Sequence, residues 1–281
     1  MRVAVVGAGT MGNGIAHTFA QHGHQVALID IAAAQLERAR QTIGANLERQ
    51  VKKGALTGEQ RDATLSNLET TTERERATGA GLIIEAVPEN PALKAEILRS
   101  LDPLAGDAIV ASNTSSLAIT SLAASVSRPD RFIGMHFMNP VPVMKLVEVI
   151  RGLQTSDDTM NTVLDVARGL GKTPVEVNDF AGFVSNRVLM PMINEAVFCL
   201  MEGVAEPEAI DTVMKLGMNH PMGPLALADL IGLDTCLSIL EVLQRDIGDD
   251  KYRPCPLLRK YVAAGWLGRK TGRGFYTYEA A

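Results

Sequence analysis

Hydrophobic residues in the first half of the chain fall into short runs separated by stretches with helical periodicity. We expect strands at residues 3–6, 25–30, 82–85, 108–112, 131–135, 146–150 and 174–177. Short apolar strands that alternate with helices are typical of a mostly parallel sheet covered by helices on both faces. The first half is therefore predicted to be a doubly wound α/β domain.

The segment after the second strand departs from a plain strand–helix–strand plan. Leu36, Ile43 and Leu47 recur at helical spacing from residue 32, and Gly54 is a stop signal after them. A second helical pattern then runs to about residue 67 before the next strand. We expect these two helices to form a helical hairpin inserted into the domain.

Several helix starts carry residues suited to capping the first turn. Thr57 followed by Gln60 matches a capping box. Asn90 before Pro91 is the typical cap followed by proline at the first helical position, and Ser156 precedes two acidic residues. Helices are therefore predicted to begin at these three points.

Beyond residue 182 the strand signals stop and nearly all of the chain has a helical pattern. We expect helices at residues 184–202, 207–216, 225–231, 234–247 and 256–264. This change predicts an α/β domain at residues 1–182 and an all-α domain at residues 183–281. The helix at 184–202 is apolar on more than one face, so either its own domain or a second subunit must cover it.

Composition limits the kinds of partner that the protein can have. The chain has 281 residues, of which 46% are hydrophobic and 21% charged, with a formal net charge of −5. A negative net charge argues against nucleic acid and against anionic membrane surfaces as partners. The longest apolar stretch, residues 184–200, contains Asn186, Arg187, Asn194 and Glu195, so it is predicted to be a core helix and not a membrane span.

Cysteine usage and the start of the chain both indicate the cytoplasm. Cys199, Cys236 and Cys255 are odd in number and have no C-x-x-C spacing, so the sequence predicts neither a disulfide framework nor a zinc site. A strand is expected from residue 3, which leaves no room for a leader peptide. We therefore expect a cytoplasmic protein without a metal centre.

A glycine-rich turn directly follows the first predicted strand. Gly7, Gly9 and Gly12, with Thr10 and Met11 between the last two, lead into a helical pattern. In the dinucleotide-binding fingerprint the first glycine permits the tight turn, the second lets the pyrophosphate approach the backbone, and the third lets helix and strand pack. The strand before and the helix after make a Rossmann-type dinucleotide site the expected function of this turn.

Asp30, at the end of the second predicted strand, is placed to choose between cofactors. A carboxylate there accepts hydrogen bonds from the ribose hydroxyls of NAD and repels the additional phosphate of NADP. Ile31 follows, where an arginine would favour NADP. We expect NAD to be the cofactor, although an Asp at such a junction can also cap the next helix.

A dinucleotide-dependent oxidation of an alcohol requires a base beside the hydroxyl group. In an open parallel sheet the ligand lies beyond the carboxyl ends of the strands, which directs attention to residues 113–116 and to His136. Glu148, a possible partner for the imidazole, lies on the next predicted strand. From spacing alone, His136 and Glu148 could be a catalytic pair or a structural hydrogen-bonded pair.

Four segments resemble one known family. They are SNTSSL at 112–117, HFMNPVPVMKLVE at 136–148, DFAGFVSN at 179–186 and KTGRGFY at 270–276. Together they resemble the short-chain L-3-hydroxyacyl-CoA dehydrogenase family, which includes bacterial 3-hydroxybutyryl-CoA dehydrogenases. The resemblance extends over essentially the whole chain. It implies NAD-dependent, reversible oxidation of a (S)-3-hydroxyacyl-CoA.

The resemblance also implies roles for individual residues at the reacting centre. His136 would be the acid/base and Glu148 its orienting partner. Ser115 would hydrogen-bond to the substrate oxygens, and Asn186 would be a ligand of the substrate. Without the resemblance, Ser115 is explained as a cap of a short helix near residue 117, a part it could also play beside the first, and Asn186 as a polar residue in a first helical turn.

Further roles follow from the same resemblance. Glu89 and Lys94 would face the nicotinamide side of the cofactor, and Asn113 would also bind the cofactor. Lys52 and Lys53 would bind the coenzyme A phosphates on the helical hairpin, although lysines at a helix end also simply complement its negative end. The family further suggests a homodimer formed through the helical half.

Two other functions remain open at this point. One is a β-hydroxyacid dehydrogenase that acts on free acids, but such enzymes transfer the proton through a lysine, which a His136–Glu148 pair does not match. The other is an NAD-binding protein without catalytic activity, comparable to a crystallin. Residues suited to catalysis at Ser115, His136, Glu148 and Asn186 argue against it.

Overall fold

The computed structural model describes residues 1–279 and divides the chain into two compact units, the first ending at Phe180 and the second beginning at Ala181. Each unit has its own hydrophobic core. The expected domain boundary, after residue 182, lies two residues beyond this division.

In the described residues, one eight-stranded sheet forms the centre of the first unit, in the order β3-β2-β1-β4-β5-β6-β7-β8. Neighbouring strands are parallel except β6 and β7, which are antiparallel. The strands are β1 Arg2–Val6, β2 Gln25–Ile29, β3 Leu68–Thr71, β4 Leu82–Glu85, β5 Ile109–Ser112, β6 Phe132–Phe137, β7 Leu146–Arg151 and β8 Thr173–Asn178. This mostly parallel sheet confirms the predicted fold class.

The sequence pattern missed β3 and placed the ends of four strands, β2, β6, β7 and β8, one or two residues away from their observed ends. β3 reads Leu-Glu-Thr-Thr and is only partly buried at the edge of the sheet, so it lacks the apolar run that identified the other strands. Strand β2 ends at Ile29, which leaves Asp30 just beyond it. Strand β6 continues to Phe137, so His136 lies within the strand and not after it.

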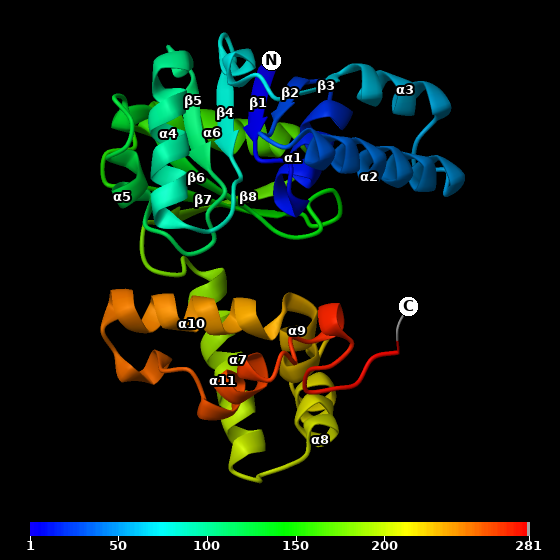
Figure 1. Cartoon of the computed structure of the whole chain (residues 1–281), viewed down its shortest axis with the longest axis vertical. Helices are drawn as coiled ribbons and strands as arrows, with labels where there is room; N and C mark the ends of the chain where they lie inside the picture. Colours follow the sequence, from blue (N-terminus) through cyan, green and yellow to red (C-terminus); the bar gives the residue numbers. More distant parts are fainter. Residues whose placement is uncertain (280–281) are drawn as a thin grey trace. The chain divides into compact units, whose positions relative to one another are not determined.

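Helices cover both faces of the sheet (Figure 1). From the centre of the sheet, the chain moves from β1 to β2 in one direction and from β4 to β5 in the other, so right-handed crossovers place the intervening helices on opposite faces. The helices are α1 Thr10–Gln21, α2 Ala33–Lys52, α3 Gly58–Ser66, α4 Pro91–Ala105, α5 Ile119–Ala123 and α6 Asp157–Gly169, with short 3-10 turns η1 Arg74–Ala77 and η2 Pro129–Arg131.

The predicted capping residues are confirmed. Thr57 and Gln60 form a reciprocal capping box at the start of α3, with Gln60 N donating to Thr57 Oγ1 at 3.1 Å and Thr57 N donating to Gln60 Oε1 at 2.8 Å. The side chains of Asn90 and Ser156 accept hydrogen bonds at the starts of α4 and α6. Helices α2 and α3 form the expected hairpin, and α2 buries Leu36, Ala39, Ile43 and Leu47.

The second unit is helical, as predicted, and packs around a core drawn from most of its helices. The expected helix at 207–216 is divided, because α8 ends at Thr212 and a π-helical turn follows. The elements are α7 Ser185–Met201, α8 Pro207–Thr212, η3 Val213–Gly217, α9 Pro224–Ile231, α10 Leu233–Ile247, η4 Asp250–Tyr252, α11 Pro256–Ala263 and η5 Arg269–Thr271.

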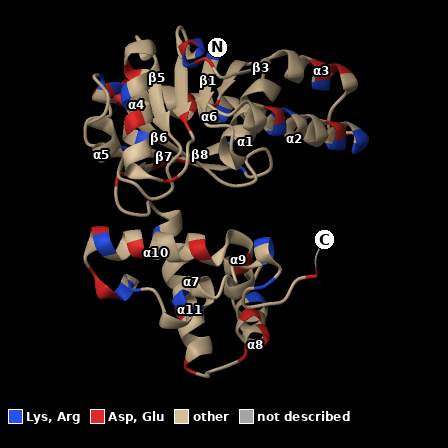
Figure 2. Cartoon of the chain, in the orientation of Figure 1, with Lys and Arg blue, Asp and Glu red and all other residues tan. Residues whose placement is uncertain are grey.

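Charged residues of both signs lie along the same helices, for example α2 and α4 (Figure 2). Such mixing agrees with the small net charge of −5. Among the described residues, no helix combines the length and apolarity needed to cross a membrane.

Candidate active site

A cavity of about 680 Å³ opens at the carboxyl ends of the parallel strands. Its walls include the segments that follow β1, β2, β4 and β5, together with Thr72 and Arg74 beyond β3. At the usual strand spacing, β3 to β5 spans roughly 19 Å, enough for an extended two-nucleotide ligand. Of the residues predicted to bind cofactor, the cavity is lined by Gly7, Gly9, Thr10, Met11, Asp30, Glu89 and Asn113. Ser115, which was predicted to bind the substrate, also lines it.

The glycine-rich turn has the geometry that a pyrophosphate site needs. Gly7 has a φ of 101°, and a Cβ atom at Gly12 would lie 1.7 Å from the Gly7 carbonyl oxygen. At Gly9 a Cβ would meet no protein atom within 4 Å, so its absence keeps open the space beside the cavity. The first turn of α1 contains no acidic residue and its N-cap, Gly9, has no capping side chain, so its N–H groups and positive end are available to an anion.

Asp30 connects the turn to the segment after β2. Its Oδ2 accepts a hydrogen bond from Ala8 N at 2.8 Å, and its Oδ1 accepts one from Ala32 N at 2.9 Å. The bond to Ala32 N is a local turn contact, but the N-cap of α2 is Ala32 and has no side-chain cap, so the alternative interpretation of Asp30 as the cap of this helix is wrong. Because each carboxylate oxygen can accept more than one hydrogen bond, Asp30 retains the capacity to bind ribose hydroxyls.

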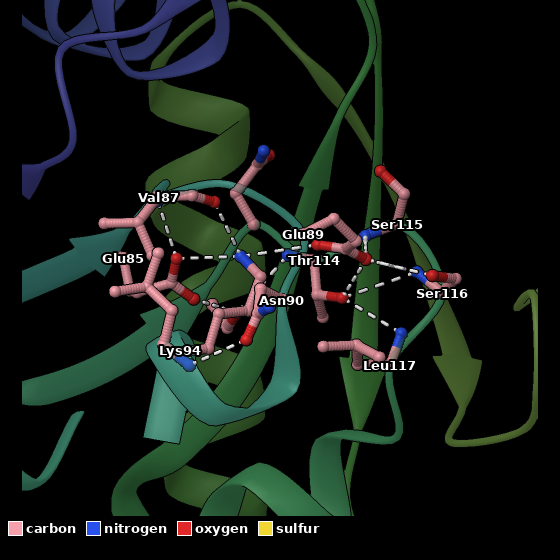
Figure 3. Close-up of polar contacts among 12 residues, drawn as sticks. Glu85, Val87, Glu89, Asn90, Lys94, Thr114, Ser115, Ser116 and Leu117 are labelled. Carbon is pink, nitrogen blue, oxygen red and sulfur yellow. Dashed lines mark hydrogen bonds and ion pairs between the residues drawn. The ribbon is translucent and has the colours of Figure 1, made fainter. Parts of the chain in front are cut away.

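At the opposite end of the cavity, Glu89 holds the segment that carries Ser115 (Figure 3). Glu89 Oε1 accepts from Thr114 Oγ1 at 2.5 Å, from Ser115 N at 2.9 Å, and from both Ser116 N and Ser116 Oγ at 3.0 Å. Burial acts to raise the pKa of Glu89, but the Lys94 charge and these hydrogen bonds outweigh it and lower that pKa. Glu89 is therefore held as a carboxylate.

Lys94 lies behind Glu89 and does not line the cavity. Its side chain is 1% exposed, and its Nζ contacts Glu85 Oε1 at 2.8 Å, the Val87 carbonyl oxygen at 3.0 Å and Glu89 Oε2 at 3.4 Å. Glu85, which sequence reasoning did not select, is fully buried. Its only signal in the sequence was a charged residue that ends an otherwise apolar strand.

His136 and Glu148 form a buried pair across the antiparallel strands β6 and β7. The two residues are direct partners in the strand register, and Nδ1 of His136 lies 2.8 Å from Oε2 of Glu148. Both side chains are less than a tenth exposed. Asn113 at the end of β5 accepts a hydrogen bond from Phe137 N at 3.0 Å, which ties the cavity wall to the residue next to His136.

The alternative interpretation of Ser115 as a helix cap is wrong. Helix α5 begins at Ile119, and the carboxylate of Asp179 accepts hydrogen bonds from Ile119 N at 2.9 Å and Thr120 N at 2.7 Å. Thr114 Oγ1 accepts from Leu117 N at 3.0 Å. These other residues organise the turn, so Ser115 is not needed to begin the helix.

The remaining predicted residues lie in other parts of the fold. Lys52 and Lys53 are exposed at the end of α2. Asn186 is buried in the first turn of α7, in the second unit. A second cavity, of about 280 Å³, lies between α1, α2 and residues 139–142, and its lining includes Arg38, Thr42 and Asn46.

The described part of the chain contains no cluster of three or more His, Cys, Asp or Glu side chains able to hold a metal ion. The glycine turn, the carboxylate after β2 and the cavity along the strand ends fit an extended dinucleotide. A buried imidazole–carboxylate pair is of the kind used for acid/base chemistry. The fold and this site together define the class of dinucleotide-dependent dehydrogenases.

Comparison with known proteins identifies the family. Residues 2–180 match the model of the NAD binding domain of 3-hydroxyacyl-CoA dehydrogenase, and residues 182–278 match its C-terminal domain. The chain belongs to the 3-hydroxyacyl-CoA dehydrogenase family, and NAD is its cofactor. It is an oxidoreductase, as the sequence predicted.

Individual relatives are similar over their whole length. The chain is 58% identical over 279 residues to a probable 3-hydroxybutyryl-CoA dehydrogenase of Bacillus subtilis, covering 99% of this chain and 97% of the relative. It is 53% identical to a 3-hydroxybutyryl-CoA dehydrogenase of Bradyrhizobium diazoefficiens, covering 100% and 96%. The crystal structure of (S)-3-hydroxybutyryl-CoA dehydrogenase from Ralstonia eutropha superposes with a TM-score of 0.96, at 52% identity and with 99% of each chain covered.

Proposed function

We propose that this chain catalyses the reversible, NAD-dependent oxidation of short-chain (S)-3-hydroxyacyl-CoA thioesters, such as (S)-3-hydroxybutyryl-CoA, to the 3-ketoacyl-CoA. The single observation that carries the proposal is the buried contact of Glu148 with His136, which lies on β6, the strand next to the one that leads to Asn113. Names of the relatives support the four-carbon substrate. The proposal selects a thioester over the free acid considered above.

His136 is proposed as the acid/base. A Glu148 carboxylate 2.8 Å from Nδ1 favours the tautomer with hydrogen on Nδ1, which leaves the lone pair on Nε2. In the oxidative direction Nε2 takes the proton of the 3-hydroxyl group, and Glu148 stabilises the imidazolium that forms. Bound NAD supplies the acceptor for the hydride that leaves C3. In the reductive direction the protonated His136 returns the proton to the oxygen.

Ser115 is proposed to hydrogen-bond to the oxygens of the substrate. Its backbone is held by Glu89 at the same cavity wall as Asn113, so its hydroxyl group is carried by an ordered segment. A donor at this point stabilises negative charge that develops on a substrate oxygen. Asn186 is proposed as a further substrate ligand, on the basis of its family-like segment.

Coenzyme A is proposed to bind along the helical hairpin. The exposed Lys52 and Lys53 at the end of α2 supply positive charge for its phosphates. The cavity beside α2, with Arg38 among its lining residues, supports a ligand on this side of the hairpin.

We also propose that the protein is a cytoplasmic homodimer.

The second unit supports the dimer proposal. Val213, Leu216 and Met218 are 61%, 83% and 60% exposed and lie within six residues of one another in and just after η3. Large apolar side chains this exposed are typical of an interface with another subunit. Sedimentation of the purified protein would measure the mass, and a monomer at micromolar concentration would contradict the proposal.

An assay of NADH oxidation with acetoacetyl-CoA tests the reaction directly. We expect turnover with acetoacetyl-CoA and much less with free acetoacetate. His136→Gln should lower kcat on the order of 10² to 10⁴ and leave the Kd for NADH nearly unchanged. His220→Gln, a change in a loop of the second unit, is the control and should retain wild-type kcat.

Three results would contradict parts of this proposal. Faster turnover of free acetoacetate than of its thioester would favour the free-acid dehydrogenase. NADH binding without any turnover would favour the non-catalytic function. Wild-type kcat in His136→Gln would exclude His136 as the acid/base.

A further inference from the structure

A buried ion pair lies one layer behind the cavity. Lys94 Nζ and Glu85 Oε1 are 2.8 Å apart, and their side chains are 1% and 0% exposed. Removing two charges from water is costly, and an apolar pair of similar volume is often equally stable or more stable. Stability alone is therefore a weak explanation for this pair.

The contacts of Glu85 join the two loops that enclose one end of the cavity. Its Oε1 also accepts a hydrogen bond from Val87 N at 2.7 Å, in the loop after β4. Its Oε2 accepts one from Ser112 Oγ at 2.6 Å, at the end of β5. One carboxylate thus holds α4, through Lys94, together with the starts of both loops (Figure 3).

Lys94 extends this network toward the cavity. Its contact with Glu89 Oε2, at 3.4 Å, places a positive charge beside the carboxylate that binds Thr114, Ser115 and Ser116. Glu85 and Glu89 therefore share one ammonium group. The position of Glu89, and of the Ser115 backbone that it binds, depends on how closely Lys94 Nζ approaches each of the two carboxylates.

We propose that Glu85 is a positioning residue that, through Lys94 and Ser112, sets the geometry of Glu89 and the Ser115 segment at the end of the cofactor cavity. The expected effect of Glu85 on turnover rests on the proposed function, whereas its expected effect on NADH binding does not. Glu85 is not among the residues that line the cavity, and its hydrogen bonds join it to Val87, Lys94 and Ser112, so it acts through these residues.

Two substitutions separate positioning from a purely structural role. In Glu85→Gln, Lys94 loses its closest carboxylate and shifts toward Glu89, which stays ionised but moves away from the Ser115 segment. In Lys94→Met, Glu89 loses the positive charge that helps to lower its pKa, so that pKa rises relative to the wild type. Protonated Glu89 accepts hydrogen bonds less strongly, so the segment loosens at a higher pH than in the wild type.

The experiment measures the Kd for NADH by fluorescence from weakly acidic to neutral pH, because a Glu89 whose pKa rises would bind a proton at a higher pH than in the wild type. Glu85→Gln should raise this Kd about tenfold at every pH, the size expected for a small misplacement of binding groups. Lys94→Met should weaken binding most at the acidic end of the range. Glu176→Gln on β8, which breaks an exposed ion pair with Arg151 of β7, is the matched control and should behave as wild type.

Steady-state kinetics with acetoacetyl-CoA provides the second readout. Glu85→Gln should lower kcat by about tenfold or more, because a displaced Ser115 segment affects the reacting geometry. If Glu85→Gln does not fold, Ser112→Ala, which removes the donor to Glu85 Oε2, should raise the Kd for NADH in the same direction.

Unchanged NADH binding and kcat in all three variants, with only a lower melting temperature, would overturn the inference and leave a structural ion pair. The same pH profile in Glu85→Gln and Lys94→Met would also overturn it. If the wild type binds NADH but does not reduce acetoacetyl-CoA, the proposed function fails, and the NADH measurements still decide the role of Glu85.

Discussion

Nδ1 of His136 lies 2.8 Å from Oε2 of Glu148, and the two residues are paired directly across β6 and β7. An antiparallel register places the side chains of opposite residues on the same face of the sheet. The strand pairing thus fixes the imidazole against the carboxylate without help from a loop. This relationship leads to the first prediction.

Glu148→Gln should lower kcat by about 10² or more, because the neutral amide neither fixes the His136 tautomer nor stabilises the imidazolium. The Kd for NADH should change by less than about twofold, since Glu148 does not line the cofactor cavity. Stopped-flow turnover with acetoacetyl-CoA and fluorescence titration with NADH measure the two quantities. If NADH binding weakened by the same factor as kcat fell, the fold around the pair would have collapsed, and this result would contradict an orienting role.

Asp30→Ala should weaken NADH binding and reduce the preference for NADH over NADPH. The substitution removes the carboxylate that would repel an additional phosphate, and it leaves Ala8 N and Ala32 N without their acceptor. Calorimetric Kd values for both cofactors test the change. Asp30→Asn, which keeps an acceptor and loses the charge, separates selectivity from loop order. Unaltered discrimination in both variants would exclude Asp30 as the selector.

Thr57→Ala should destabilise the protein by about 1 kcal/mol, because the side-chain acceptor for Gln60 N at the start of α3 is lost. Urea unfolding of the first unit would show this as a lower midpoint. Thr57→Ser retains the hydroxyl group and should recover most of the loss. No difference between the alanine and serine variants would mean that the cap contributes nothing measurable.

His17 should make stability depend on pH in the weakly acidic range. Burial lowers the pKa of His17 from 6.5 to about 4, and its side chain is inaccessible to solvent. Between these values the unfolded chain binds a proton that the folded protein does not, so stability falls as the pH decreases from 6.5 to 4. The loss from this residue is about 3 kcal/mol.

His17→Leu removes this titration. The difference in unfolding free energy between variant and wild type should be constant above about pH 7 and should shift in favour of the variant as the pH falls. Urea titrations at several pH values measure that difference. A difference that stays constant down to pH 4 would show that His17 does not control the acid sensitivity.

Local patterns in the sequence predicted much of the fold. Capping at Thr57, Asn90 and Ser156 depends on residues within three positions, and helical and strand periodicity are equally short-range, so both can be recognised without coordinates. Strand β3 was the exception, because a short polar edge strand has no apolar run to recognise. Pairing with its neighbouring strand, and not its own composition, makes this segment a strand.

The candidate site likewise has residues that the sequence predicted and residues whose placement it did not. The glycine turn and Asp30 belong to one strand–helix–strand unit with a characteristic sequence, and family-like segments pointed to Ser115, His136, Glu148 and Asn186. The placement of Lys94 behind the cavity could not be foreseen, because a lysine in an ordinary helix is expected to be exposed.

By itself, the sequence determined the two-part organisation, the glycine turn and the candidate acid/base pair. Only the tertiary structure decided that Glu85 reaches Ser112, 27 residues away, and that Glu89 reaches Ser116, also 27 residues away. The physical reason is that these bonds depend on which strands become neighbours and on how far each strand extends. That outcome comes from the packing of the whole sheet, and no local run of residues encodes it.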